Sequence, residues 1–117
     1  MKNNNERVYK MSFASVFPHY IAKVEKKGRT LSELKEVICW LTGYQEEQIQ
    51  QHIERKTNFQ EFFAQAKLHP NADQITGTIC GYRIEEIEDE LMKKIRYLDK
   101  LVDELAKGKA IDKICRK

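Results

Sequence analysis

The amino-acid sequence predicts a mainly α protein, a compact single-domain helical bundle of about five helices. Apolar residues recur at the three- and four-residue spacing of a helical face, and residues typical of helix ends bound most of these stretches. The 117 residues are enough to bury a core without disulfides or metal. Residues 74–84 depart from the pattern and are predicted to be a short strand or an irregular segment, which leaves an α+β fold as the alternative.

The chain begins with a polar stretch that has nothing to bury. Residues 1–7 contain three consecutive asparagines, so we expect a disordered tail there. We expect residues 8–117 to form a single helical domain.

The first predicted helix has its apolar residues on one face from Phe13 onward. Pro18 cannot donate a hydrogen bond in a helix interior but is tolerated in a first turn. We therefore predict Ser15 as the N-cap, with the helix running to Lys27 and stopping at Gly28.

The segment "TLSE" begins the second predicted helix. Thr30 and Glu33 have the spacing of a capping box, and an apolar pattern follows that ends at Gly43. The next segment, "QEEQIQQHIERK", is otherwise polar but carries Ile49 and Ile53 four residues apart, which predicts a surface helix with a narrow buried stripe.

A phenylalanine-rich helix is predicted next, capped by Thr57 or Asn58. Its apolar face consists of Phe59, Phe62, Phe63 and Ala66. Three aromatic rings in one short helix should form a major part of the core.

The C-terminal part of the chain resumes a clear helical pattern after the ambiguous stretch "ITGTICGYRI", whose β-branched residues and glycines suit a strand. From Glu85 to Lys107 we predict one long helix, and residues 109–117 add a short turn pinned by Ile111 and Ile114. The long helix carries a coiled-coil-like seam of Leu91, Ile95, Leu98, Val102 and Leu105.

The formal net charge of +3 is spread unevenly. Residues 1–29 hold seven bases and two acids, residues 30–106 hold nine and fifteen, and residues 107–117 hold five and one. No apolar run has the length of a membrane-spanning helix, and the N-terminus lacks the apolar core of a signal peptide. We expect a cytoplasmic protein with no membrane partner.

Nucleic-acid binding is the first alternative function. Lys23, Lys26, Lys27 and Arg29 form a basic rim that could bind it weakly. Residues 30–56 have the outline of a helix-turn-helix, but the second helix carries a net charge of −1 where phosphate approach needs positive charge. Nucleic acid is therefore an unfavoured partner.

A small-ligand site is predicted around the glycine-containing segment, with Trp40, Tyr44, Cys80 and Arg83 as the residues that would line it. An enzyme with an unrecognised pocket around Tyr44, Cys80 and Arg83 is the second alternative. The sequence favours a non-enzymatic role, since Ser12, Ser15 and His19 are not surrounded by a motif, such as G-x-S-x-G, that positions a nucleophile and its base. We predict no catalytic residue.

Metal and cofactor binding are not predicted either. The histidines and cysteines show no ligand spacing such as C-x-x-C or H-E-x-x-H. Cys39 and Cys80 are expected to be buried as small hydrophobes, and Cys115 to be exposed in a basic tail. The three thiols encode no disulfide framework.

Five strings in this chain resemble a family of small bacterial proteins, the domain-of-unknown-function family numbered twenty-two hundred. They are "YKMSFASVFPHYIAKVEKKGRT", "WLTGY", "FFAQA", "ITGTICGYRIEEIED" and "IRYLDKLVDELAKGK". The resemblance runs from about Arg7 onward and implies an uncharacterised cytoplasmic protein, without an activity or ligand. The family often has proline where this chain has Glu90, which would make Asp89 an N-cap and break the long helix there.

The function predicted from these observations is a non-enzymatic protein-interaction or small-ligand-binding module. Its partner would be a protein or a small molecule of unknown identity. The seam of the C-terminal helix could also pair with a second copy, so homo-oligomerisation is the further expectation.

Overall fold

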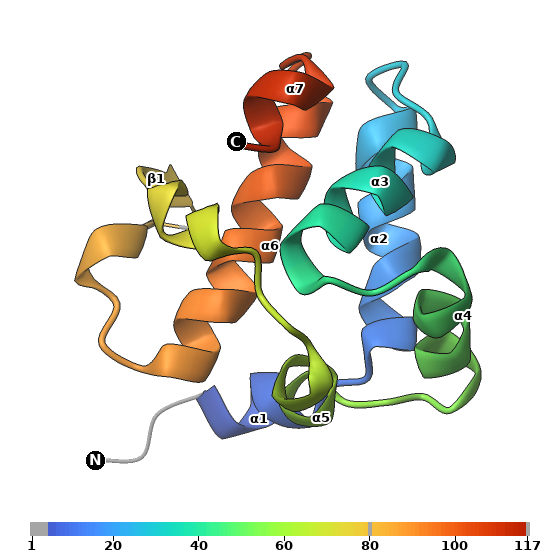
Figure 1. Ribbon diagram of the computed structural model, residues 1–117, viewed down its shortest axis with the longest axis vertical. Helices are drawn as coiled ribbons and strands as arrows, with labels where there is room; N and C mark the ends of the chain where they lie inside the picture. Colours follow the sequence, from blue (N-terminus) through green and yellow to red (C-terminus); the bar gives the residue numbers. More distant parts are fainter. Residues whose placement is uncertain (1–4, 80, 117) are drawn as a thin grey trace.

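The computed structural model describes residues 5–79 and 81–116, and it confirms the predicted mainly α fold (Figure 1). The α-helices are α1 (Asn5–Lys10), α2 (Phe13–Glu25), α3 (Leu31–Thr42), α4 (Glu46–Glu54), α5 (Phe59–Gln65), α6 (Glu90–Ala106) and α7 (Ile111–Ile114). Two short 3-10 helices, η1 (Pro70–Gln74) and η2 (Ile84–Glu86), flank a two-stranded hairpin of β1 (Thr78–Ile79) and β2 (Tyr82–Arg83).

The core lies between α2, α3, α5 and α6, with α6 standing beside α2 through the middle of the molecule (Figure 1). Phe13, Leu34, Phe62 and Leu98 are completely buried there. The expected aromatic contribution of α5 is confirmed, since all three of its phenylalanines are at most 2% exposed.

The apolar seam of α6 packs inside its own chain. Ile95, Leu98, Val102 and Leu105 are each at most 2% exposed, and Leu91 is half-buried. A second copy would therefore have to use another surface, because these side chains are already covered.

The expected N-terminal tail is partly wrong, because Asn5 to Arg7 belong to α1. Residues 1–4 lie outside the described residues. Val8 and Tyr9 pack against the core, and the Tyr9 hydroxyl binds the Asp89 carboxylate at the start of α6. These two contacts anchor a segment whose sequence alone shows little to bury.

The start of α2 also differs from the prediction of Ser15 as N-cap. Ser12 is the cap, and its Oγ accepts from the amide of Ser15 at 3.1 Å. Pro18 consequently lies inside the helix. The segment is held there because the Phe13 amide donates to the Thr57 carbonyl at 2.8 Å and the Phe13 ring is fully buried. The helix ends at Glu25, and a turn leads to Gly28.

The ends of α3 are confirmed. Thr30 and Glu33 form the capping box, and Gly43 takes the left-handed conformation with φ of 76°. A Cβ at Gly43 would lie 2.7 Å from the Lys67 carbonyl oxygen, so the following chain crosses too closely for any side chain. Asn58 caps α5, as one of the two predicted alternatives.

The ambiguous stretch near residues 74–84 contains the hairpin, in which Thr78 pairs with Arg83 and Ile79 with Tyr82. The single long helix predicted from Glu85 is wrong. Asp89 accepts from the Met92 amide at 2.9 Å and starts α6 at Glu90, as the family resemblance implies. The chain from Ile84 to Glu86 forms the separate turn η2 because Ile84 is drawn into the core.

Among the described residues, no helix combines the length and the apolar character needed to cross a lipid bilayer.

Candidate functional site

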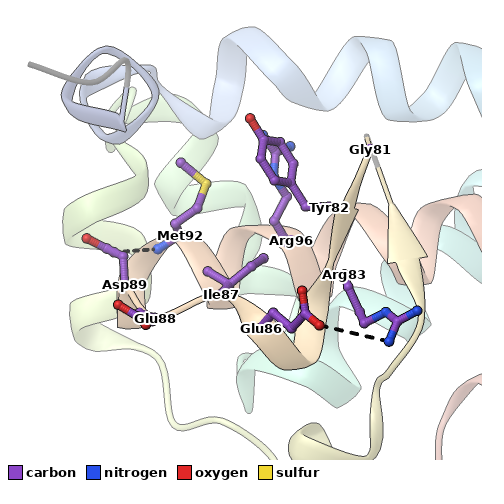
Figure 2. A pocket seen from close by; sticks show the side chains of 9 residues that line it. All are labelled: Gly81, Tyr82, Arg83, Glu86, Ile87, Glu88, Asp89, Met92 and Arg96. Carbon is purple, nitrogen blue, oxygen red and sulfur yellow. Dashed lines mark hydrogen bonds and ion pairs between the residues drawn. The ribbon is translucent and has the colours of Figure 1, made fainter.

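A cavity of about 400 Å³ opens between the hairpin and the N-terminal half of α6 (Figure 2). We call it the hairpin cleft. It is lined by Gly81, Tyr82, Arg83, Glu86, Ile87, Glu88, Asp89, Met92 and Arg96. Four parts of the chain supply these residues: the hairpin, the end of η2, the connection that follows it, and the first two turns of α6.

The cleft has an apolar centre with an exposed aromatic ring. Tyr82 is 57% exposed, while Ile87 is half-buried and Met92 is buried. Figure 2 shows the Met92 and Ile87 side chains pointing toward the space beside the Tyr82 ring. A large exposed apolar side chain next to a hollow is a feature of binding surfaces.

The Tyr82 ring lies over the guanidinium of Arg96, and Asp99 fixes the position of that guanidinium. The Arg96 guanidinium lies 5.6 Å from the ring centroid, and its Nη1 binds Asp99 Oδ2 at 2.6 Å. Asp99 in turn accepts from the Tyr20 hydroxyl at 3.1 Å. This chain of contacts reaches from α2 to the hairpin, so the ring is supported by the body of the protein.

The rim of the cleft carries more acids than bases. Glu86 and Arg83 form a loose ion pair at 3.9 Å with both side chains mostly exposed, and Glu88 is exposed beside them. Hydrogen bonds from the Tyr9 hydroxyl and the Met92 amide lower the pKa of Asp89. The Asp89 carboxylate is therefore an anion at neutral pH.

Of the four residues predicted as a small-ligand site, the three that the structure describes are not brought together. Arg83 lines the hairpin cleft. Tyr44 is buried, and its hydroxyl donates to the Phe62 carbonyl at 2.6 Å. Trp40 lines a different hollow, and Cys80 lies outside the described residues.

That second hollow, of about 620 Å³, separates α3 from α7. It is lined by Glu36, Cys39, Trp40, Ile111, Asp112 and Cys115. The Trp40 ring stacks on His69 with centroids 4.5 Å apart, so one face of the ring is already covered by the chain. Within the described part of the chain, no group of three or more metal-ligating side chains converges here or elsewhere.

Two of the cysteine expectations are wrong. Cys115 was expected to be exposed, but it is buried at 4% exposure because α7 folds back onto the end of α6. Cys39 was expected to be buried and is half-buried. Its partial burial, followed by the nearby Glu46 carboxylate, raises the pKa of the Cys39 thiol.

Two of the four residues of the basic rim predicted for nucleic acid are engaged within the protein. Arg29 binds Glu33 and two backbone carbonyls, and Lys23 forms an ion pair with Asp103 at 3.3 Å. Lys26 and Lys27 are exposed. Two adjacent lysines are a small footprint compared with the several phosphate contacts of a typical nucleic-acid interface.

Sequence reasoning missed most of the hairpin cleft. It identified Arg83 but not Tyr82, Met92 or Arg96. One signal was available: Met92 and Arg96 lie four residues apart on α6 and off the apolar seam. What the pattern lacked was any indication that the hairpin folds over that side of α6.

Comparison with known proteins identifies a family and a similar solved structure. The family model described as "Uncharacterized protein conserved in bacteria (DUF2200)" matches residues 7–116. The crystal structure of an uncharacterized protein, SP1917, is similar with 46% sequence identity and a TM-score of 0.88, over 93% of this chain and 90% of that chain. The comparison with curated proteins found no match.

Proposed function

This chain belongs to the DUF2200 family of uncharacterised conserved bacterial proteins, and we propose that it is a non-enzymatic binding module whose binding site is the hairpin cleft. One observation carries the proposal. The Tyr82 ring is more than half exposed, yet it is held over Arg96 at the edge of a cavity with an apolar centre.

The electrostatics of the cleft support binding over catalysis. General acid catalysis near neutral pH needs a carboxyl group whose pKa is raised, and the pKa of Asp89 is lowered instead. The residues that line the described cleft are two arginines, three carboxylates, a glycine, a tyrosine and two apolar side chains, and they include no serine, cysteine, histidine or lysine. This set suits recognition by charge and apolar contact.

The site is also largely preformed. Asp89 fixes the first turn of α6, and the Arg96–Asp99 ion pair fixes the support of the Tyr82 ring. A preformed site loses little conformational entropy when it binds a ligand, which favours affinity. An apolar group that fills the centre would be covered by Ile87, Met92 and Tyr82.

A fragment titration tests the proposal. Indole, phenol and cyclohexylamine would be added to the protein with ¹³C-labelled methyl groups on isoleucine and methionine. We expect chemical-shift changes at the Met92 and Ile87 methyls and none at Ile53, which lies on α4. The Tyr82→Ala variant should weaken binding, because it removes one wall of the cleft.

The control is Glu47→Ala, at an exposed residue of α4 that does not line the cleft. This variant should keep fragment binding. If none of the three fragments shifts the Met92 and Ile87 methyls, the proposed function is overturned.

A further inference from the structure

The cleft lies at the open edge of the hairpin, as the order of contacts along α6 shows. Lys100 Nζ donates to the Thr78 carbonyl of β1 at 3.1 Å, and Arg96, one turn earlier, lies under Tyr82 of β2. Met92, a further turn earlier, lines the cleft. From Lys100 to Met92, α6 therefore lies next to β1, then next to β2 and then next to the cleft. The cleft is consequently beside the edge of β2 that faces away from β1.

The register of the hairpin leaves backbone groups of β2 directed to that edge. The Ile84 amide donates to the Gly77 carbonyl at 2.9 Å, so Gly77 and Ile84 form a hydrogen-bonded pair. Antiparallel pairs alternate between hydrogen-bonded and non-hydrogen-bonded, so the next pair, Thr78 and Arg83, is non-hydrogen-bonded. The amide and carbonyl of Arg83 therefore point away from β1, just as the Thr78 carbonyl points away from β2 to reach Lys100.

The charge of the rim determines whether the cleft favours a positively or a negatively charged ligand. Glu86, Glu88 and Asp89 line the cleft, and Arg83 is the exposed cation among them. The second cation, Arg96, is neutralised by Asp99 at 2.6 Å. An exposed ion pair such as Arg83–Glu86 is weak and easily exchanged for another partner. The rim therefore has a net negative charge that favours a cationic neighbour.

From these three features we propose that the hairpin cleft binds an extended, basic segment of a partner protein. The segment adds to the edge of β2 through two hydrogen bonds between the Arg83 backbone and a residue next to its anchor, since neighbouring residues of a strand point to opposite faces. One of its side chains, large and apolar, enters the space between Tyr82, Ile87 and Met92. Lysines or arginines that flank this anchor lie near Glu86 and Glu88. This inference rests on the proposed function and names the class of partner.

The open backbone edge favours a peptide over a small organic cation. A free amine could use the apolar centre and the acidic rim, but it would leave the Arg83 amide and carbonyl to solvent. An extended peptide uses all three features together. Backbone pairing supplies affinity without sequence preference, and the anchor and the flanking charges supply the specificity.

Fluorescence anisotropy with matched labelled peptides tests the proposal. The probe is the blocked peptide Lys-Thr-Phe-Thr-Lys, compared with Glu-Thr-Phe-Thr-Glu, with Lys-Thr-Ala-Thr-Lys, and with the probe N-methylated at both threonines, because the residue that pairs with Arg83 is a neighbour of the anchor. We expect each change to weaken binding, by about tenfold for loss of the anchor and about fivefold for loss of one backbone hydrogen bond. The Kd of the probe should rise as salt increases from about 0.05 to about 0.5 M.

The charge requirement is checked on the protein side with Glu88→Lys. Its matched control is Glu47→Lys, which makes the same charge change at an exposed residue near the start of another helix, α4. Glu88→Lys should lower the affinity for the basic probe and raise the affinity for the acidic peptide, while Glu47→Lys should change neither affinity. Circular dichroism of both variants confirms that they are folded.

The outcomes separate this inference from the proposed function. If the fragments shift the Met92 and Ile87 methyls but no peptide binds, the peptide inference fails and the binding module stands. If cyclohexylamine binds as tightly as the probe and N-methylation has no effect, the site takes small cations and the inference is overturned. Equal affinity for the basic and acidic peptides would also overturn it.

Discussion

Arg29 and Glu33 are joined by two hydrogen bonds, from Nε to Oε1 at 3.1 Å and from Nη2 to Oε2 at 3.0 Å. The same guanidinium donates through Nη1 to the carbonyls of Leu105 and Lys109, at 3.2 and 2.9 Å. One side chain thus connects the turn before α3 to the end of α6. The residue that the sequence suggests as a surface cation is part of the frame of the molecule.

Replacing Arg29 with lysine should destabilise the protein. Lysine keeps the charge but cannot bind a carboxylate and two carbonyls in the fork geometry of arginine. Loss of the two donations to carbonyls corresponds to about 2 kcal/mol, measured by urea denaturation. Lys27→Gln, at an exposed neighbour, is the control and should leave the urea midpoint unchanged. Equal stability of Arg29→Lys and the native protein would contradict the role assigned to the guanidinium.

Acid should weaken the fold partly through Glu33. The hydrogen bond from Arg29, followed by that from the Thr30 amide, lowers the pKa of Glu33 from 4.5 to about 2. Because the folded pKa is depressed, the stabilisation is fully present above pH 4.5 and is lost as pH falls toward 2. In Glu33→Gln the fall in urea midpoint over this range should be smaller. An unchanged pH dependence in that variant would exclude Glu33 as its source.

Tyr44 should resist ionisation until strongly alkaline pH. Burial raises the pKa of its phenol from 10.0 to about 12, and the hydroxyl donates to the Phe62 carbonyl at 2.6 Å. The folded state favours the neutral phenol, so stability is present below pH 10 and declines as pH rises toward 12.

The Tyr44→Phe variant provides the measurement. It should lower the free energy of unfolding at neutral pH by about 1 kcal/mol, since one buried hydrogen bond is lost. It should also remove one late-titrating tyrosine from the ultraviolet absorbance titration. Tyr82→Phe, at an exposed ring, serves as the comparison and should not change stability. The assignment is wrong if the late titration persists in Tyr44→Phe.

His52 is buried on α4, where its Nδ1 lies 2.9 Å from Thr57 Oγ1 and its ring contacts Tyr44 and Phe62. Burial, followed by the positive charge of Arg55, lowers the pKa of His52 below 6.5. The neutral ring stabilises the fold fully above pH 6.5, and that contribution is lost as pH falls below this value.

Nuclear magnetic resonance of the imidazole protons should therefore show His52 titrating below pH 6.5. The His52→Gln variant should have a flatter dependence of stability on pH in the mildly acidic range. If the His52 ring of the folded protein titrates above pH 6.5, burial does not lower its pKa.

Gly43 and Gly28 give a matched pair of substitutions. Both have positive φ, 76° and 84°, but a Cβ at Gly43 would lie 2.7 Å from the Lys67 carbonyl oxygen, whereas one at Gly28 would meet nothing within 4 Å. Gly28→Ala should lose about 1 kcal/mol from the left-handed backbone alone. Gly43→Ala should lose clearly more in thermal unfolding, because the carbonyl must also move. Equal losses of stability in the two variants would show that the Lys67 backbone can move away from residue 43 without a cost in stability.

Much of the fold is encoded in short stretches that can be interpreted one at a time. The capping box at Thr30 and Glu33, the glycine stop at Gly43 and the phenylalanine face of α5 are local patterns, and the structure confirms each. The errors at Ser15 and in the N-terminal tail have a different origin. Burial of Phe13 and docking of Tyr9 on Asp89 involve partners far along the chain.

The candidate site was far less accessible to sequence reasoning. Arg83 is part of the glycine-containing stretch that suggests a site. Trp40 and Tyr44 are predicted beside it, but they lie in another hollow and in the core. Residues with suitable chemistry are common in any sequence. Which of them share a cavity depends on how the hairpin and α6 pack.

By itself, the sequence determined a mainly α protein of the DUF2200 family, because helix caps and apolar spacing act over a few residues and long matching strings identify a family. Only the tertiary structure decided what the charged and aromatic residues do. In the folded protein Arg29 binds Glu33, Tyr44 is buried, and the Tyr82 ring is exposed over Arg96. The physical reason is that burial and charge pairing are properties of contacts between distant segments, and these contacts exist only once the chain has folded.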